Sequence, residues 1–290
     1  MPIIIHSPHV CLTQPSIGIV TPSFNQSRFI ETTINSVLNQ TYPNLQYAIV
    51  DGGSSDGSIE IIQKYSNSLH YWISEPDKGQ SEAINKGLRF INADIIGWLN
   101  SDDIILPGAL NRVASTFASQ PETQVVLGRT IWTDSELNII RPCIHPQVHK
   151  YFGKHGIYYF SQQSLFWRRT LFERVGYFDE SLHTCMDIDL WIKILKLGIK
   201  ITVIPYYLSV WRLHKDCKSC ATGWGKGTQW DADRTILRSR HKDMQYGCKS
   251  VIALLLYYLL KIFTGPALST LLFQLRWKNK PLSSFIKRSY

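Results

Sequence analysis

The sequence predicts an α/β fold with a mostly parallel central sheet that is flanked by helices. Short apolar runs alternate with segments of helical periodicity through the first half of the chain, and this alternation is typical of parallel sheets wrapped by helices. A polar stretch follows each of the first four apolar runs. The 290 residues are 44% hydrophobic and 18% charged, which indicates a globular chain with a sizeable core. The length allows one large domain, or one domain with an appendage.

The predicted strands are short apolar runs, and the predicted helices repeat apolar residues at helical spacing. The strands expected in the first half are residues 17–20, 47–50, 69–74, 95–99 and 125–128. The helices expected between them are residues 30–38, 59–65 and 81–90, followed by one that Pro107 opens, because proline is tolerated in the first turn. In the second half we expect irregular structure over about 129–160, a strand at 165–167, a helix from Asp187 and a strand at 201–205.

The fourth apolar run stops at two adjacent carboxylates, Asp102 and Asp103. The earlier strands also end in polar residues, at Thr21 to Asn25, at Asp51 and at Asp77. Parallel strands place these ends on one edge of the sheet, where open α/β sheets bind ligands. Two close carboxylates repel each other unless a cation or donor groups lie between them, and Mg²⁺ and Mn²⁺ prefer oxygen ligands. The pair therefore indicates either a cation site or a solvated turn that caps the next helix.

Two nucleotide-binding schemes are excluded because their motifs are missing. No Gly-x-x-x-x-Gly-Lys-Ser/Thr sequence occurs, so the chain has no P-loop. No Gly-x-Gly-x-x-Gly sequence follows the first strand, which argues against a dinucleotide site of the Rossmann type. A phosphorylated ligand at this edge would therefore be held by a metal ion and side chains.

Several spaced motifs resemble those of the family 2 glycosyltransferases, which have the GT-A fold. The resemblance covers about residues 15 to 220, in the family's order, and is specific for the family but not for the sugar. The stretches that carry it are Thr21-Pro22-Ser23-Phe24-Asn25, Val50-Asp51-Gly52-Gly53-Ser54-Ser55-Asp56-Gly57, Glu75-Pro76-Asp77-Lys78-Gly79-Gln80-Ser81, Ala83-Ile84-Asn85-Lys86-Gly87, Trp98-Leu99-Asn100-Ser101-Asp102-Asp103, Phe178-Asp179-Glu180-Ser181-Leu182, Met186-Asp187-Ile188-Asp189-Leu190-Trp191 and Arg212-Leu213-His214.

The resemblance implies transfer of a sugar from a nucleotide diphosphate sugar, with UDP-sugars favoured, to a hydroxyl of a glycan or lipid-linked acceptor, with inversion at the anomeric carbon. A catalytically inactive nucleotide-sugar-binding protein is the alternative. The donor-binding residues that the resemblance implies are Thr21, Pro22 and Phe24 in the nucleoside pocket, Asp51 on the base, Asp77 near the ribose or base, Lys78 and Gln80 near the phosphates or sugar, and Asp102 on the ribose. A Pro-Asp-Lys-Gly sequence is also an ordinary turn.

A Mn²⁺ or Mg²⁺ cofactor is also implied by the resemblance, with Asp103 favoured over Asp102 as its direct ligand. His214 would complete the metal shell or touch the diphosphate, and a structural histidine is the alternative. The family often has an acid where this chain has Asn100, which leaves fewer acidic ligands. The cation would neutralise charge on the departing nucleoside diphosphate.

Asp187 matches the family's catalytic aspartate, the general base for the acceptor hydroxyl, with helix capping as the alternative. Asp187 and Trp191 are four residues apart and share a helix face. Asp189 lies about 200° round the helix from Asp187 and can pair with Lys193. Met186 stands where the family often has a glutamate.

The acceptor is expected to contact Gln163 and Trp191. Gln163 lies just before the apolar strand at 165–167, at a position that resembles the family's acceptor-side segment. Half-buried polar support is the alternative role for Gln163.

Positive charge and apolar side chains concentrate at the C-terminal end. The net charge is +9, and residues 250–290 contain six basic and no acidic residues. The apolar run 251–263 is shorter than the roughly twenty residues that span a bilayer, and a second run follows at 267–275. Two short apolar helices flanked by lysines suit an interfacial or re-entrant membrane anchor; core packing or a dimer interface is the alternative.

The expected organisation is a GT-A domain over 1–240 and a helical tail over 241–290. The domain divides into a nucleotide-binding half, about 15–130, and an acceptor half, about 131–240. Without a basic leader before the short run Ile3 to Ile5, a secretory signal is not expected, so we expect a cytoplasmic protein, peripheral on the inner face of the membrane if the tail binds lipid. Nucleic acid is not an expected partner, because the basic residues cluster beside the apolar tail.

Overall fold

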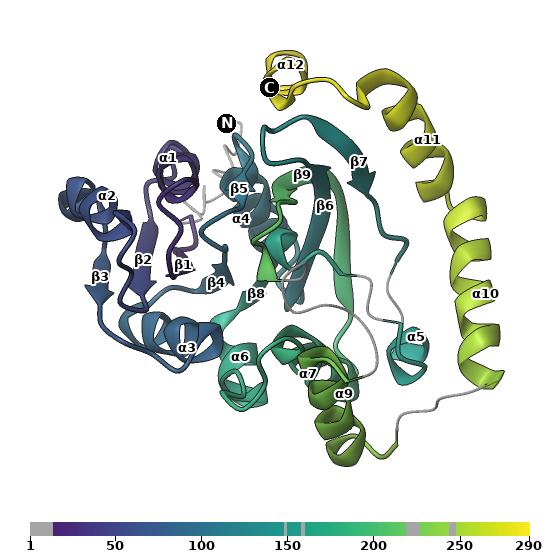
Figure 1. Ribbon diagram of the computed structural model, residues 1–290. Helices are drawn as coiled ribbons and strands as arrows, with labels where there is room; N and C mark the ends of the chain where they lie inside the picture. The colour runs from purple at the N-terminus through teal and green to yellow at the C-terminus, as the bar shows by residue number, and fades with distance from the viewer. Residues whose placement is uncertain (1–13, 148–149, 158–159, 219–226, 244–247) are drawn as a thin grey trace, which may run out of the picture.

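The computed structural model describes residues 14–290 except 148–149, 158–159, 219–226 and 244–247. It has an α/β fold with one nine-stranded sheet in the order β3-β2-β1-β4-β8-β6-β9-β5, and β7 pairs with β6. Helices cover both faces of this sheet (Figure 1). The strands are β1 (Ile17–Ser23), β2 (Leu45–Asp51), β3 (Tyr71–Ser74), β4 (Ile95–Trp98), β5 (Ile104–Ile105), β6 (Val125–Thr133), β7 (Ile139–Cys143), β8 (Leu165–Arg168) and β9 (Ile201–Arg212).

The helices alternate with these strands through the first half of the chain, as predicted. They are α1 (Ile30–Leu38), α2 (Ser58–Lys64), α3 (Gln80–Phe90), α4 (Ala109–Ser119), α5 (Lys150–Lys154), α6 (Arg169–Val175), α7 (Met186–Lys196), α9 (Gln229–Arg240), α10 (Cys248–Phe263), α11 (Pro266–Trp277) and α12 (Leu282–Ser289), with a short helical turn at Gln162–Ser164.

Alternate residues of the strands enter two cores, one on each face of the sheet. Ile19 and Ile49 belong to the core that α1, α2 and α4 cover, whereas Val20 and Ala48 belong to the core beneath α3, α6 and α7. Side chains of a strand point alternately to opposite faces, and here both faces are buried, which explains the unbroken apolar runs. Helix α3 lies close to the sheet because Gly87 has no side chain: a Cβ there would lie 2.5 Å from Val20 Cγ1.

The parallel half of the sheet brings its polar strand ends to one edge. β1 pairs in parallel with β2 and β4, and β2 pairs in parallel with β3. Ser23 is opposite Asp51, and Asp51 is opposite Ser74. The predicted convergence of these ends is therefore confirmed.

The second half of the sheet is mixed and more regular than expected. β8 runs antiparallel to β4 and β6, and β9 runs parallel to β6 and antiparallel to β5. The expectation of irregular structure from residue 129 was wrong: β6 continues to Thr133 and forms an antiparallel pair with β7. β9 likewise runs to Arg212, well past the predicted end at 205.

The C-terminal helices pack against the domain with one face only. Phe273, Trp277, Leu282 and Phe285 are buried in a cluster with residues of β5, β6, β7 and β9, such as Ile139. The backbone N–H of Ile139 donates to the carbonyl of Lys280 (2.9 Å), and that of Asn279 donates to the carbonyl of Ile139 (2.7 Å). The expected alternative of core packing therefore holds for the inner face of the tail.

Candidate active site

Asp51 fixes the loop that follows β2. It is fully buried, and its carboxylate accepts hydrogen bonds from the Ser54 N–H (2.8 Å), the Ser54 hydroxyl (2.6 Å) and the Ser74 hydroxyl (2.7 Å). A carboxylate without exposed surface cannot contact a nucleotide base in this conformation. In this conformation Asp51 holds the end of β2 to the end of β3, and its contact with the base stays a prediction.

Phe24 is the accessible residue among the three predicted to line the nucleoside pocket. Its side chain is 60% exposed just beyond β1. Thr21 and Pro22 are buried, and the Thr21 hydroxyl lies 3.0 Å from the Tyr47 hydroxyl. Both residues are buried in this conformation, and their contact with the nucleoside stays a prediction.

Asp77 lies half-buried beside the turn after β2. A Cβ at Gly52 would come 2.8 Å from the Asp77 Oδ2, so glycine is what allows this carboxylate to approach the loop. The Asp77 Oδ1 accepts the Gly79 N–H at 2.8 Å, which is the turn interaction that the sequence left open as an alternative. Burial raises the pKa of Asp77 above its ordinary value, although the Gly79 N–H opposes that shift.

Gln80 links three segments at the edge of the sheet. Its Nε2 donates to the Asn100 Oδ1 at 2.7 Å, and its Oε1 accepts from the Lys218 Nζ at 2.8 Å. The neighbouring Lys78 is exposed, and its backbone N–H donates to the Glu82 carboxylate at 2.8 Å. Gln80 therefore connects α3 with the end of β4 and with the segment after β9.

The two adjacent carboxylates at the end of β4 differ in exposure. Asp103 has no exposed surface, and its carboxylate accepts from the Arg212 N–H (3.1 Å) and the Gln163 Nε2 (3.0 Å). Burial and the neighbouring Asp102 raise the pKa of Asp103 well above its ordinary value. The Asp102 side chain is 14% exposed, and its Oδ2 lies 3.0 Å from the His214 Nε2. Asp102 is the accessible carboxylate of the pair, which favours it over the predicted Asp103 as the direct metal ligand.

Gln163 supports Asp103 from the short helical turn before β8. It is 7% exposed, and its amide is engaged by the Asp103 carboxylate. This contact favours the alternative role of polar support, and the contact of Gln163 with the acceptor stays a prediction.

The residues present fit a divalent cation when the donor supplies further ligands. Asp102 and His214 offer one carboxylate and one imidazole at the same point, and an octahedral ion can take its other oxygens from a diphosphate and water. Within the described ranges, no group of three or more His, Cys, Asp or Glu side chains could hold an ion without such help. The His214 Nδ1 is buried without a hydrogen-bond partner.

Arg212 is the functional candidate to which the sequence assigned no role. It is 3% exposed at the end of β9, and its Nε and Nη2 are buried without hydrogen-bond partners. The guanidinium lies 4.9 Å from the centre of the Phe29 ring, which also packs 4.4 Å from the His214 ring. Burial lowers the pKa of Arg212, while Asp103 and Asp102 favour its charge. A buried cation with unused donors suits an anionic ligand.

Asp187 lies half-buried at the start of α7, as predicted. Its Oδ1 accepts the Ile188 N–H at 2.8 Å. Burial raises the pKa of Asp187, whereas that N–H and the charge of Lys218 oppose the shift. Asp189 faces elsewhere, as its helical position predicted: it is 2% exposed, with Oδ2 2.7 Å from the Lys193 Nζ and Oδ1 2.8 Å from the His241 Nε2.

Trp191 belongs to the core. It is 1% exposed, and its ring lies 4.4 Å from that of Phe160. A side chain without accessible surface cannot touch an acceptor in this conformation. Trp191 thus has a packing role in this conformation, and its contact with the acceptor stays a prediction.

A second site residue that the sequence did not reveal is Asp233 of α9. It is fully buried, and its Oδ2 accepts from the Thr184 N–H (2.5 Å), the Thr184 hydroxyl (2.9 Å) and the Cys185 N–H (3.1 Å). Cys185 is the N-cap of α7 and has no side-chain cap of its own. Asp233 thus holds the N-cap residue Cys185, two residues before Asp187, from another helix. No sequence pattern signals such a long-range contact.

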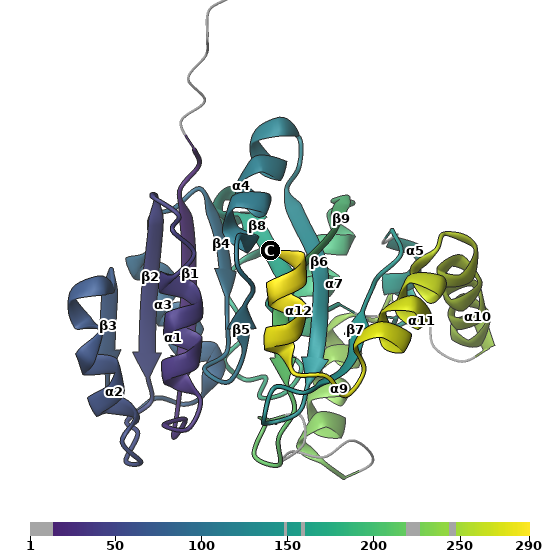
Figure 2. The same cartoon turned by 90° about the horizontal axis from the view of Figure 1, so that it is seen from above.

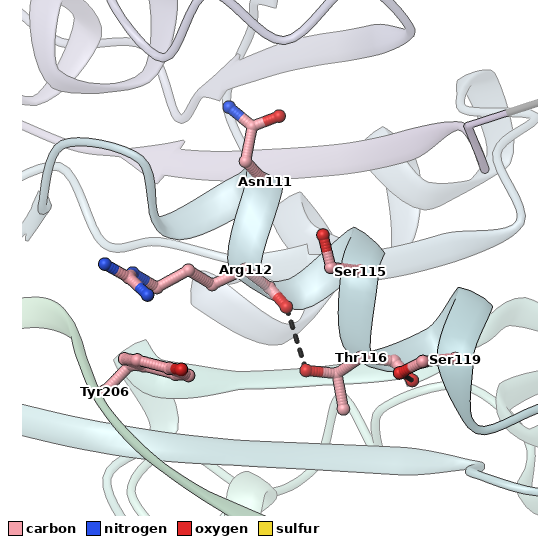
Figure 3. A pocket seen from close by; sticks show the side chains of 6 residues that line it. All are labelled: Asn111, Arg112, Ser115, Thr116, Ser119 and Tyr206. Atoms are coloured by element: carbon pink, nitrogen blue, oxygen red, sulfur yellow. Dashed lines mark hydrogen bonds between the residues drawn. The ribbon is translucent and has the colours of Figure 1, made fainter.

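A shallow polar groove lies elsewhere, over α4 (Figure 3). Its lining includes Arg112, whose guanidinium lies 4.0 Å from the Tyr206 ring centre, and Thr116, which donates to the Arg112 carbonyl at 2.8 Å. None of the candidate donor or metal residues lines this groove. It is separate from the edge that Asp102, Arg212 and Asp187 define.

Two solved structures share the fold of this chain. S. aureus TarS 1-349 in complex with UDP-GlcNAc aligns with a TM-score of 0.60 at 16% identity, covering 79% of this chain and 66% of that one. The mannosyltransferase PcManGT from Pyrobaculum calidifontis, in complex with GDP-Man and Mn²⁺, aligns with a TM-score of 0.54 at 17% identity, covering 89% and 81%. The fold is thus of the GT-A type, as expected.

Sequence relatives agree with the class that fold and site define, a sugar-transferring enzyme. The model of glycosyl transferase family 2 matches residues 18–178, more than half of the chain, and the chain belongs to that family. Chondroitin synthase of Escherichia coli is 28% identical over 186 residues, which cover 63% of this chain and 27% of that protein. The chain spans less than two thirds of the length of the curated relatives it matches.

Proposed function

We propose that this glycosyltransferase moves a sugar from a nucleotide diphosphate sugar, with UDP-sugars favoured, to a hydroxyl of a glycan or lipid-linked acceptor, with inversion. The observation that carries the proposal is the buried Arg212 guanidinium, whose unused N–H groups lie at the same edge as Asp102 and His214. An anionic diphosphate satisfies a cation of this kind. The UDP-GlcNAc and GDP-Man complexes of the structural neighbours support this donor class.

On the donor side, each accessible residue has a role that its chemistry suits. The exposed Phe24 ring packs against the nucleoside, and Asp77 and Lys78 flank the ribose and phosphates. Asp102 and His214 would hold Mn²⁺ or Mg²⁺ together with the diphosphate. When bound, that ion supplies positive charge that stabilises the departing nucleoside diphosphate. The unpartnered Nε and Nη2 of Arg212 would donate to the diphosphate.

On the acceptor side, Asp187 is the general base. The proton of the acceptor hydroxyl passes to the Asp187 carboxylate while the hydroxyl oxygen forms a bond to the anomeric carbon. The bond from that carbon to the diphosphate oxygen breaks, and its electron pair leaves with the nucleoside diphosphate. An ordinary aspartate is a weak base at neutral pH, and the raised pKa of Asp187 brings its basicity closer to what proton transfer needs.

Melting temperatures measured with a panel of nucleotide sugars, with and without Mn²⁺, test the donor assignment. A ligand that binds the native state raises its stability, by about 2.7 kcal/mol at a hundredfold excess over Kd. We expect UDP-sugars to raise the melting temperature most. Asp102→Asn should remove the Mn²⁺-dependent part of the rise, and Arg212→Ala should remove most of the part that persists in chelator.

Asp103→Asn is the matched control for Asp102→Asn, because it changes a buried neighbour. We expect it to keep the Mn²⁺ response and, because burial raises the pKa of Asp103, to be no less stable than the parent at neutral pH. No rise with any nucleotide sugar would contradict the proposal. Donor binding without donor hydrolysis or transfer would favour the alternative, an inactive binding protein.

A further inference from the structure

The outer faces of α10 and α11 expose an unusual number of large apolar side chains. On α11, Leu268, Leu271, Leu272 and Leu275 follow the i, i+3, i+4, i+7 spacing of one helix face, and all are more than half exposed. On α10 the exposed set is Val251, Ile252, Leu255, Leu256, Tyr258, Leu259, Ile262 and Phe263. A contiguous exposed patch of this kind marks an interaction site. We call these twelve residues the tail face.

The inner faces of the same helices hold them to the domain. Ala253 and Tyr257 of α10 pack with Phe152 of α5 and with Ile157, and Phe273 and Trp277 of α11 pack in the cluster that includes α12. Within the described residues no single helix is long and apolar enough to cross a membrane; α10 and α11 meet that criterion only as a pair, bent by 64°. Crossing a bilayer would pull both inner faces off the protein, whereas lying along a surface leaves them buried.

The charge around the tail face indicates which kind of partner binds there. No acidic residue occurs from Ser250 to the C-terminus, and the basic residues there are Lys261, Arg276, Lys278, Lys280, Lys287 and Arg288. A second copy of this chain would bring the same charges together and add repulsion. Anionic headgroups would pair with them, since basic residues near an anionic membrane surface are attracted to it.

We propose that the tail face binds the surface of an anionic membrane, with α10 and α11 lying in the interface. The tail flanks the molecule on the side away from α2 and β3, and α5 of the acceptor half lies beside α10 (Figures 1 and 2). Binding in this way turns the acceptor half toward the lipid. This orientation suits a lipid-linked acceptor. Only that link to the acceptor rests on the proposed function.

Vesicle sedimentation of the full chain, without any sugar nucleotide, tests the proposal. The protein should pellet with vesicles of phosphatidylcholine and phosphatidylglycerol, and bind those of phosphatidylcholine alone less tightly. The double variant Leu255→Glu and Leu275→Glu changes side chains that are 60% and 76% exposed, so the fold should tolerate it. Because the hydrophobic and electrostatic contributions to interfacial binding act together, we expect the variant to lose affinity by about tenfold or more.

Leu197→Glu is the matched control, because Leu197 is a 44% exposed leucine just after α7. It should bind vesicles like the unmodified chain, and both variants should keep the response to nucleotide sugars. An unmodified chain that stays in the supernatant with both vesicle types overturns the proposal. So does a stable dimer that the double variant abolishes, since a second copy would then be the occupant. Neither outcome affects the donor assignment.

Discussion

At the scale of single residues, we expect Asp187 of α7 to act in catalysis and Asp189 to act in stability. Asp187→Asn should lower transfer by about 10²–10⁴, the usual contribution of a general base. Donor affinity should persist, because the donor groups Asp102 and Arg212 lie elsewhere. Since burial raises the pKa of Asp187, kcat/KM of the unmodified enzyme should fall as pH drops through that raised value. The variant should lack this limb of the profile.

Stability gives a second readout for Asp187. A carboxyl whose pKa is raised in the folded state binds more protons there than in the unfolded chain. Its contribution to stability therefore falls as the pH rises. The fall spans the pH range from the ordinary pKa of 3.8 to the raised pKa of Asp187. Asp187→Asn should therefore be no less stable than the parent at neutral pH, as urea unfolding would show. Asp189→Asn should instead be destabilised, because it disrupts a buried ion pair, while transfer per folded molecule persists. The opposite ranking in transfer would refute the choice of base.

At the scale of elements, α9 sets the position of α7 through two contacts. Asp233 holds Thr184 and Cys185, the two residues before α7, and His241 binds Asp189 further along. Burial alone would raise the pKa of Asp233, but hydrogen bonds from Thr184, Gln229 and Cys185 hold it below its ordinary value. Asp233→Ala leaves those donors unsatisfied, which costs about 1–3 kcal/mol each, and frees the turn that carries Asp187. We expect kcat to fall while the Kd for donor changes little.

His241→Ala is the comparison for Asp233→Ala, because it breaks the other contact between the same two helices. It should lower the melting temperature by leaving Asp189 with Lys193 as its remaining charged partner, but kcat should change far less. Equal losses of kcat in the two variants would mean that α9 acts only through stability. Asp233→Asn, which keeps an acceptor oxygen, should restore part of kcat.

At the scale of the whole molecule, the tail is part of the folded unit. Deleting residues 248–290 would expose Ile139, Leu106 and the rest of the cluster that Phe273, Trp277, Leu282 and Phe285 cover. Each such buried side chain contributes about 1.5–3 kcal/mol, so the midpoint of urea unfolding should fall markedly. The folded fraction should still bind nucleotide sugars. An unchanged midpoint would show that the tail is an independent appendage.

The sequence determined the positions of the parallel strands and the edge at which they end. Runs such as 17–20 and 47–50 are apolar throughout because both faces of those strands are buried. A short continuous apolar run in the sequence therefore predicts a buried strand. Helical geometry likewise determined that Asp187 and Asp189 face apart, as the Lys193 and His241 contacts of Asp189 confirm.

Only the tertiary structure decided which polar residues are accessible. Asp102 and Asp103 are adjacent and chemically identical, but β5 follows them and pairs with β9, so that Ile104 lies opposite Val210 and the Arg212 N–H reaches the Asp103 carboxylate. The burial of Trp191, the contact of Asp233 with Cys185 and the inner face of the tail depend in the same way on elements distant in the chain. Local pattern fixes which residues are apolar or charged, whereas long-range packing fixes which of them meet solvent, a ligand or a membrane.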